Sequence, residues 1–344
     1  MRKIFFLLFA TIFMLECKEK TINRSNLEIF ESAGMKGKPV HMYFLNSQEG
    51  YLFNYTTESQ DQTAEQLNDP SFIPNTTDIS TIYKTIDGGK NWAKVYTLKD
   101  YAFYDTAFCD GSSIYIKIIN NKESLKNKIL KFDFRTFQST ILAYNFERMG
   151  EFWAFNQKVY INSKNNGSNN IYSIDKDFRK LDSVRVNRVF KDRVTLLNQK
   201  PYVLTWDNEI YDIQNDEGVK IPSTDELACI TKNGVESLIV VGKSSSSVTL
   251  YRYNVMTRHA QFLKEFDGYS IIQGLQSNEK VIYGFIGNIK GPFTEYDLFY
   301  SLDHGKTWQI QELKEKSYIR PVCLVGNILY IYSGGDKFQK IVFT

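Results

Sequence analysis

The chain of 344 residues carries 42 basic and 39 acidic side chains, so its formal net charge at pH 7 is only +3. Acids and bases are interspersed, which excludes the basic stripe that proteins need to bind a nucleic-acid backbone. Aromatic residues make up 15% of the chain and fall in short runs with β-branched residues, a composition typical of strands. We therefore expect an almost entirely β protein with no nucleic-acid partner.

Basic residues precede an apolar run at the N-terminus. Arg2 and Lys3 come before Ile4 to Leu15, a run with the length of a signal-peptide core and too short to span a bilayer. Cys17 follows, and it resembles the lipid-modified cysteine of a bacterial lipoprotein. The resemblance implies a signal segment over 1–17, a linker over 18–25, and an outer-membrane anchor at Cys17 in the cell envelope, on its periplasmic or surface side. The alternative is an ordinary secreted protein.

Two turn-like stretches far apart in the chain share one spelling, TIDGGKNW and SLDHGKTW. Their aspartates are 216 residues apart, which is five steps of about 43 residues, within the period of four-stranded propeller blades. Weaker copies between them give intervals of 46, 42, 41, 38 and 49 residues. The series is Asp87, Asp133, Asp175, Asp216, Asn254 and Asp303. Each position follows a strand-like stretch, so the series predicts the turn between two strands of each blade.

The cysteines form a second series. Cys109, Cys229 and Cys323 each end a short apolar strand, and their spacings of 120 and 94 residues are about three and two blade periods. Equivalent positions in separated blades lie too far apart for a disulfide. We therefore expect buried, unpaired thiols. The chain has no metal-type CxxC pattern and three scattered histidines, so we expect no metal and no cofactor.

The two ends of the chain complete the pattern. The last unit supplies only about three strands, while Asn26 to Ser32 reads as a strand with no blade of its own. Joining them closes the ring and leaves no long unpaired sheet edge. We predict a single all-β domain over 26–344, a monomeric β-propeller of seven blades closed by its N-terminal strand, with six or eight blades as alternatives.

The two full motifs resemble the Asp-box, or BNR repeat, of pattern Ser/Thr-x-Asp-x-Gly-x-x-Trp. This repeat occurs in the propellers of sialidases, sortilin-type receptors and photosystem assembly factors. In that family the aspartate accepts backbone N–H bonds within the turn, and the tryptophan packs into the blade. The resemblance implies a structural role, and no catalytic one, for Asp87, Gly89, Trp92, Asp303, Gly305 and Trp308.

A sialidase-like activity would, by the same resemblance, require three arginines around the substrate carboxylate. It would also require a tyrosine nucleophile with a glutamate partner and an aspartate acid/base. The Arg-Ile-Pro stretch that the family carries near its N-terminus is absent, and the nearest string, YIRPV around Arg320, lies at the other end of the chain. We assign no catalytic residue.

Aligning the innermost strands predicts one candidate site, because charges at one level of neighbouring strands converge on the channel. The cluster predicted at the channel mouth consists of Arg148, Glu151, Arg193, Glu226 and Arg320. It either binds an anion or consists of solvated ion pairs. The sequence favours a non-enzymatic propeller, anchored in the envelope, that binds a protein or glycan partner. The alternative is a divergent sialidase-like glycoside hydrolase.

Overall fold

The structure is a computed structural model. It describes residues 25–59, 63, 66, 76–120, 126–142, 144, 146, 149–155, 158–165, 168–175, 181–186, 188–191, 193–221, 225–290, 293–313 and 319–344. The expected signal segment, Cys17 and the linker up to residue 24 lie outside the described residues, as does Arg148. Within the described ranges, no helix is both long and apolar enough to cross a membrane.

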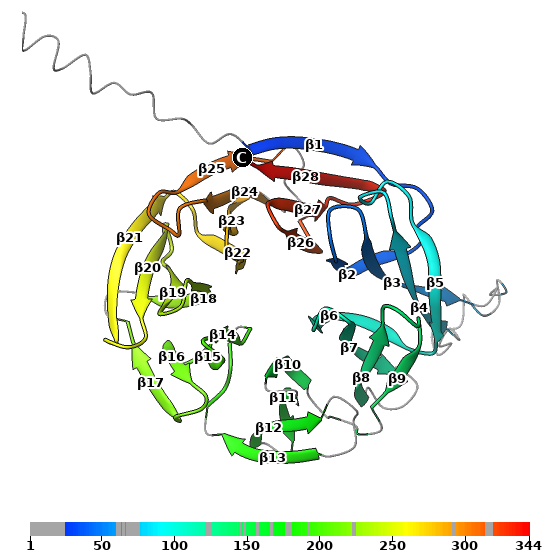
Figure 1. Ribbon diagram of the computed structural model, residues 1–344, viewed down its shortest axis with the longest axis horizontal. Coiled ribbons are helices and arrows are strands. Elements are labelled where there is room, and N and C mark those ends of the chain that lie inside the picture. The colour runs from blue at the N-terminus through cyan, green and yellow to red at the C-terminus, as the bar shows by residue number, and fades with distance from the viewer. Residues whose placement is uncertain are drawn as a thin grey trace, which may run out of the picture.

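Seven four-stranded antiparallel sheets surround a central axis (Figure 1). Strands are given from the innermost outward. The first blade has β2 (Lys38–Phe44), β3 (Gly50–Ser59), β4 (Thr76–Thr85) and β5 (Ala93–Lys99), and the second has β6 (Ala102–Cys109), β7 (Ser113–Asn120), β8 (Lys126–Asp133) and β9 (Ser139–Ile141). The third blade has β10 (Met149–Phe155), β11 (Lys158–Asn165), β12 (Ser168–Asp175) and β13 (Leu181–Val186). The predicted seven blades are confirmed.

The next three blades repeat this order. The fourth blade has β14 (Thr195–Leu197), β15 (Lys200–Leu204), β16 (Glu209–Asp212) and β17 (Glu217–Lys220). The fifth has β18 (Glu226–Asn233), β19 (Ser237–Lys243), β20 (Ser247–Asn254) and β21 (His259–Asp267). The sixth has β22 (Ile271–Ser277), β23 (Ile282–Lys290), β24 (Phe293–Ser301) and β25 (Gln309–Glu312). The seventh blade has β26 (Val322–Val325), β27 (Ile328–Tyr332), β28 (Lys337–Phe343) and, outermost, β1 (Ser25–Glu31).

The middle strands carry the apolar core because neighbouring blades cover both of their faces. In β7, SIYIKIIN, every side chain except Lys117 is buried. The outermost strand β13, LDSVRV, has exposed side chains at its four central positions. The short aromatic and aliphatic runs of the sequence are therefore the second and third strands of the blades, where burial of apolar surface stabilises the ring.

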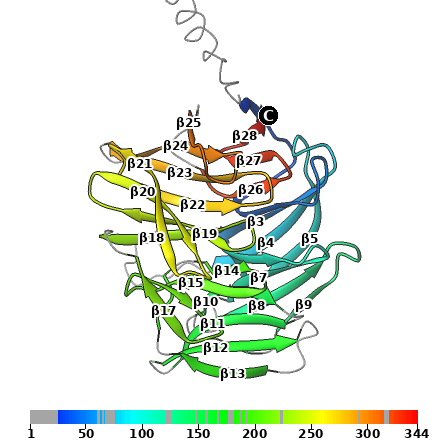
Figure 2. The same ribbon diagram turned by 60° about the vertical axis from the view of Figure 1, so that its left-hand side comes forward.

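The N-terminal strand closes the ring. β1 pairs antiparallel with β28 from Ser25 opposite Phe343 to Glu31 opposite Lys337, and the two strands lie side by side in both views (Figures 1 and 2). The ring of Phe30 stacks on that of Phe338, with 5.8 Å between their centroids. The predicted closure by the strand that follows residue 25 is confirmed.

The two turns that share the Asp–x–Gly–x–x–Trp pattern also share a hydrogen bond. Oδ1 of Asp87 accepts the backbone N–H of Asn91 at 3.0 Å, and Oδ1 of Asp303 accepts the backbone N–H of Thr307 at 2.9 Å. Burial alone would raise the pKa of both carboxyls, but the hydrogen bonds that they receive lower it below the ordinary value. Both carboxylates are therefore held charged inside turns.

The described intermediate turns follow the third strand of their blades, as expected, with one correction of register; the residues directly after Asp175 lie outside the described part. In the turn between β16 and β17 the carboxylate that accepts backbone N–H groups is Asp212, from Gln214 at 3.0 Å and Asn215 at 3.2 Å. Asp216, the predicted position, lies at the end of that turn with a φ of 55° and accepts the hydroxyl of Tyr211. The sequence NDEG resembles the motif, but the Asx turn begins directly at the strand end.

The three described cysteines lie on innermost strands of three blades, β6, β18 and β26. None of these three forms a disulfide, Cys229 and Cys323 are buried, and Cys109 is partly exposed. The prediction of unpaired thiols is confirmed, with Cys109 less buried than expected.

Candidate binding site in the central channel

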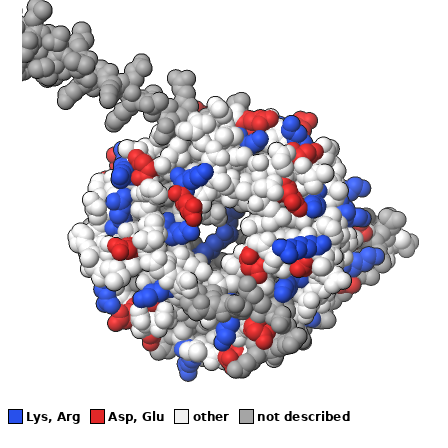
Figure 3. Space-filling model, in the orientation of Figure 1, with Lys and Arg blue, Asp and Glu red and all other residues white. Residues whose placement is uncertain are grey.

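The innermost strands of all seven blades line a central cavity of about 1010 Å³. On the face in Figure 3 the cavity is a central opening, with basic side chains visible inside it. Four basic residues and one acidic residue are among the described residues of its lining, namely Lys38, Arg193, Lys232 and Arg320 against Asp78. The cavity is therefore suited to an anionic ligand.

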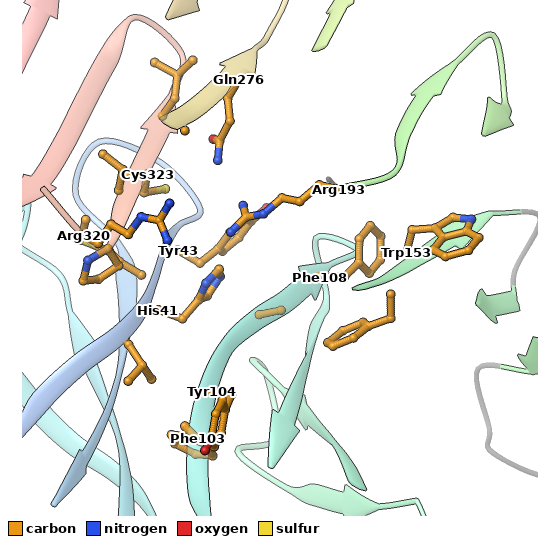
Figure 4. A pocket seen from close by; sticks show the side chains of 18 of the residues that line it. His41, Tyr43, Phe103, Tyr104, Phe108, Trp153, Arg193, Gln276, Arg320 and Cys323 are labelled. Atoms are coloured by element: carbon orange, nitrogen blue, oxygen red, sulfur yellow. The ribbon is translucent and has the colours of Figure 1, made fainter. Parts of the chain in front are cut away.

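Two arginines face each other across this cavity. Arg193 precedes β14 and Arg320 precedes β26, and these strands are three blades apart in a ring of seven. Both side chains are exposed to the channel and point into it (Figure 4). Both lie at the edge of the ring where the innermost strands begin, which we call the mouth rim. Arg193 has no hydrogen bond or ion pair with any residue that the structure describes.

His41, on β2, faces the same space. Its ring keeps some exposure to the cavity but is surrounded by protein atoms. Burial, together with the positive charge of Arg193, lowers its pKa to about 3. The imidazole is therefore neutral at physiological pH and can both donate and accept a hydrogen bond.

Gln276, on β22, supplies an oriented amide. Its Oε1 accepts the hydroxyl of the buried Tyr283 at 2.9 Å. This bond leaves the amide nitrogen directed into the cavity (Figure 4). Together with the two guanidinium groups, the amide gives the cavity donors from three blades.

Aromatic side chains cover the part of the wall formed by the second and third blades. Tyr104 and Phe108 on β6 keep exposed surface there (Figure 4). Phe103 on β6, and Phe152 and Trp153 on β10, also line the cavity but are buried. The donors and the aromatic wall come from different blades, so a ligand with one charged edge and one apolar face can contact both at once.

Tyr43 lies deeper on β2, two positions beyond His41. Burial, followed by its hydrogen bond with the Cys109 thiol, raises its pKa far above the ordinary value. Burial also raises the pKa of the neighbouring Cys323 thiol to about 12. Neither group is an activated nucleophile, because both are held in their protonated forms.

The predicted cluster is only partly brought together. Arg193 and Arg320 line the cavity. Glu226 instead forms ion pairs with Lys191 and with Lys243, the latter at 3.1 Å, and its hydrogen bond with Lys191 lowers the pKa of its carboxyl. Glu151 lies on β10, with its side chain outside the described part, and Arg148 lies outside the described residues altogether.

Sequence reasoning missed His41 and Gln276. The alignment considered charged residues at one level of the strands and did not consider neutral polar residues inside them. The signal was the alternation in KPVHMYF, which places His41 and Tyr43 on one face of β2. A polar residue on the channel face of an innermost strand marks the lining of such a cavity.

No family model and no curated protein matches the chain. Among solved structures it is similar to the propeller domain of the Trilobed protease from Pyrococcus furiosus, with a TM-score of 0.57 and 12% identity over 85% of this chain and 90% of that one. This chain is a β-propeller. A virginiamycin B lyase from Staphylococcus aureus with quinupristin has a TM-score of 0.55 and 12% identity, over 93% and 100% of the two chains.

An oligogalacturonate lyase from Vibrio parahaemolyticus is similar to the same extent, with a TM-score of 0.55 and 10% identity over 92% of this chain and 97% of that one. These proteins differ in activity, and identities of 10–12% show the β-propeller fold alone.

Proposed function

We propose that the protein is a non-enzymatic binding protein that holds the carboxylate-bearing end of an acidic glycan in its central channel. The observation that carries this proposal is the pair Arg193 and Arg320, which face each other across the cavity. A planar guanidinium binds a carboxylate through two parallel hydrogen bonds, and it keeps its charge at any physiological pH.

The surroundings of the arginines favour a sugar. The amide of Gln276 and the neutral imidazole of His41 are suited to hydroxyl groups, which both donate and accept hydrogen bonds. Tyr104 and Phe108 on β6 keep exposed surface in the cavity lining and offer flat apolar faces for the C–H side of a ring. A cavity of about 1010 Å³ accommodates a small ligand or the end of a chain, and it excludes a folded domain.

The alternative, a sialidase-like hydrolase, has less support. A tyrosine nucleophile needs a neighbouring base, whereas burial and Cys109 raise the pKa of Tyr43. The acidic residue among the described lining is Asp78, whose carboxylate accepts the hydroxyl of Thr57 at 2.9 Å. Two arginines, and not three, are among the described residues of the cavity wall.

The proposed location rests on the N-terminal sequence. A signal segment ending at Cys17 would place the propeller in the bacterial envelope on a lipid anchor. The ring would then present its channel to extracellular or periplasmic material.

Titration calorimetry with a glucuronic acid tetrasaccharide tests the proposal, with a glucose tetrasaccharide as the neutral counterpart. We expect the acidic sugar to bind and the neutral one not to bind. Arg193→Gln should weaken binding about 10- to 100-fold, since hydrogen bonds to charged groups contribute about 1.5–3 kcal/mol. Arg185→Gln, on the exposed face of the outermost strand β13, is the matched control and should bind like the parent protein.

Three results would overturn parts of the proposal. If a peptide bound through its terminal carboxylate and the sugar did not bind, the arginine pair would remain the binding site, but the ligand would be a protein. Release of reducing sugar by the parent protein would show an enzyme. Equal affinities of the parent protein and Arg193→Gln for the acidic sugar would show that the central channel is not the binding site.

A further inference from the structure

Trp206 stands out among the tryptophans of the chain, all four of which the structure describes. Trp92 and Trp153 are each 4% exposed and Trp308 is partly buried, whereas Trp206 is 64% exposed. A large, rigid aromatic side chain on the surface of a ring whose other tryptophans pack inside it marks a contact surface.

The backbone of Trp206 is fixed. It lies in the turn between β15 and β16, and its N–H donates to the carbonyl of Val189 at 3.1 Å. Close by, the N–H of Lys191 donates to the carbonyl of Leu204 at 2.8 Å, and Phe190 bridges to Thr205. The indole therefore projects from a hydrogen-bonded platform and is presented in one place.

Charged groups border one side of the indole. The ammonium of Lys191 lies over the ring, 5.3 Å from its centroid. Lys191 is itself held by Glu226, which also pairs with Lys243 at 3.1 Å. The lysine covers one face of the indole, and the exposure of the side chain shows that most of the rest is open to solvent.

Trp206 belongs to the same rim as the arginine pair. The turn between the second and third strands of a blade lies at the edge where the innermost strand begins. The segment that contacts Trp206 through Val189 and Lys191 continues inward to Arg193, two positions beyond Lys191. A ligand that leaves the cavity past Arg193 therefore meets Trp206 and its charged border on the same blade.

We propose that Trp206 is a second sugar subsite, on which the next ring of the acidic glycan stacks while its carboxylate-bearing end lies between Arg193 and Arg320. This inference rests on the proposed function and extends it from one ring to an oligosaccharide. A pyranose ring has an apolar C–H face, whose partial positive charge complements the negative face of an indole. Its hydroxyl edge would meet the ammonium and carboxylate groups of Lys191, Glu226 and Lys243.

Ligands of different length can distinguish the two subsites, because only an oligosaccharide is long enough to contact both. Affinities are measured for glucuronic acid and for its tetrasaccharide, with the parent protein and with Trp206→Ala. We expect Trp206→Ala to weaken tetrasaccharide binding roughly 5- to 20-fold and to leave binding of the monosaccharide unchanged. Trp206→Phe should keep most of the affinity, because it retains an aromatic face. Met256→Ala should change neither, because Met256 is similarly exposed but lies in the turn between β20 and β21 on the opposite rim.

Each outcome is decisive. Equal losses for both ligands, or no loss for the tetrasaccharide, would overturn the subsite. The arginine site would still stand if Arg193→Gln weakened the binding of both sugars. Normal tetrasaccharide binding by Arg193→Gln would overturn the proposed function whatever Trp206→Ala does. Failure of the parent protein to bind either sugar would overturn both. Fluorescence gives a second readout: at saturating tetrasaccharide, the emission of the parent protein should change more than that of Trp206→Ala, which retains Trp153 in the cavity lining.

Discussion

The backbone N–H of Trp92 donates a 3.0 Å hydrogen bond to the carbonyl of Ala33, and so joins the first blade to the segment that follows the closing strand. The N–H of Ala33 in turn donates to the carbonyl of Lys90 at 2.9 Å, and the hydroxyl of the buried Ser32 donates to the carbonyl of Gly89. The turn that contains Asp87 and Gly89 therefore stabilises the closure of the ring as well as its own blade.

Gly34 makes this contact possible. Its φ is +85°, and a Cβ at this position would lie 2.3 Å from the carbonyl oxygen of Trp92. We expect Gly34→Ala to destabilise the protein by about 3 kcal/mol, from left-handed strain of about 1–2 kcal/mol and displacement of the backbone. Gly111→Ala is the control, since Gly111 has a φ of +89° but nothing within 4 Å. Urea unfolding of both variants measures the difference, and equal losses would rule out the contact as the cause.

Deletion of the closing strand should open the ring. Without β1, the strand β28 loses its outer partner along its whole length, and Leu27 and Phe30 leave the apolar core. We expect a chain lacking residues 1–31 to unfold at a clearly lower temperature than one lacking residues 1–24, which retains β1. Calorimetry compares the two, and identical transitions would show that the seventh blade is stable with three strands.

The two motif tryptophans should differ in their contribution to stability. Trp92 is 4% exposed and packs against Phe44 and Phe338, at 6.0 and 6.2 Å between ring centroids. Trp308 keeps partial exposure beside Phe299. We expect Trp92→Ala to cost about 3–5 kcal/mol of unfolding free energy and Trp308→Ala about half of that. Sugar affinity measured on the folded fraction should not change, and a selective loss of affinity would contradict a purely structural role.

The number of blades was predictable because the turn that ends the third strand of each blade recurs along the sequence. An aspartate that accepts a backbone N–H within its own turn depends only on local sequence, so Asp87 and Asp303 carry the same signal in different blades. The register of one turn was not predictable in this way, because Asp212 and Asp216 are both acidic residues in one short turn. Only the pairing of β16 with β17 decides between them.

The candidate site was less predictable, because it depends on contacts between blades. Alignment of strands placed Arg193 and Glu226 at one level, but Lys191 and Lys243 pair with Glu226. Lys243 ends the second strand of the blade, so its position depends on a register that no local pattern encodes. The neutral state of His41 depends first on its burial among several blades and then on the charge of Arg193, which comes from across the channel.

His41 should make the stability of the protein depend on pH. Its pKa is about 3 in the folded protein and about 6.5 in the unfolded chain, so the unfolded chain binds a proton between these values and the folded protein does not. His41 therefore contributes its full stability above pH 6.5, and this contribution is lost as the pH falls toward 3. The loss is at most about 1.4 kcal/mol per pH unit.

Urea unfolding at pH 7.5 and pH 5, with the parent protein and His41→Gln, isolates this contribution from that of the carboxyl groups. The stability of the parent relative to the variant should fall by about 1–2 kcal/mol between the two pH values, and a constant difference would mean that the folded imidazole titrates normally. Arg193→Gln separates the two causes. Because burial is the larger cause, most of the pH dependence should persist in this variant, and its disappearance would assign the low pKa of His41 to the facing arginine.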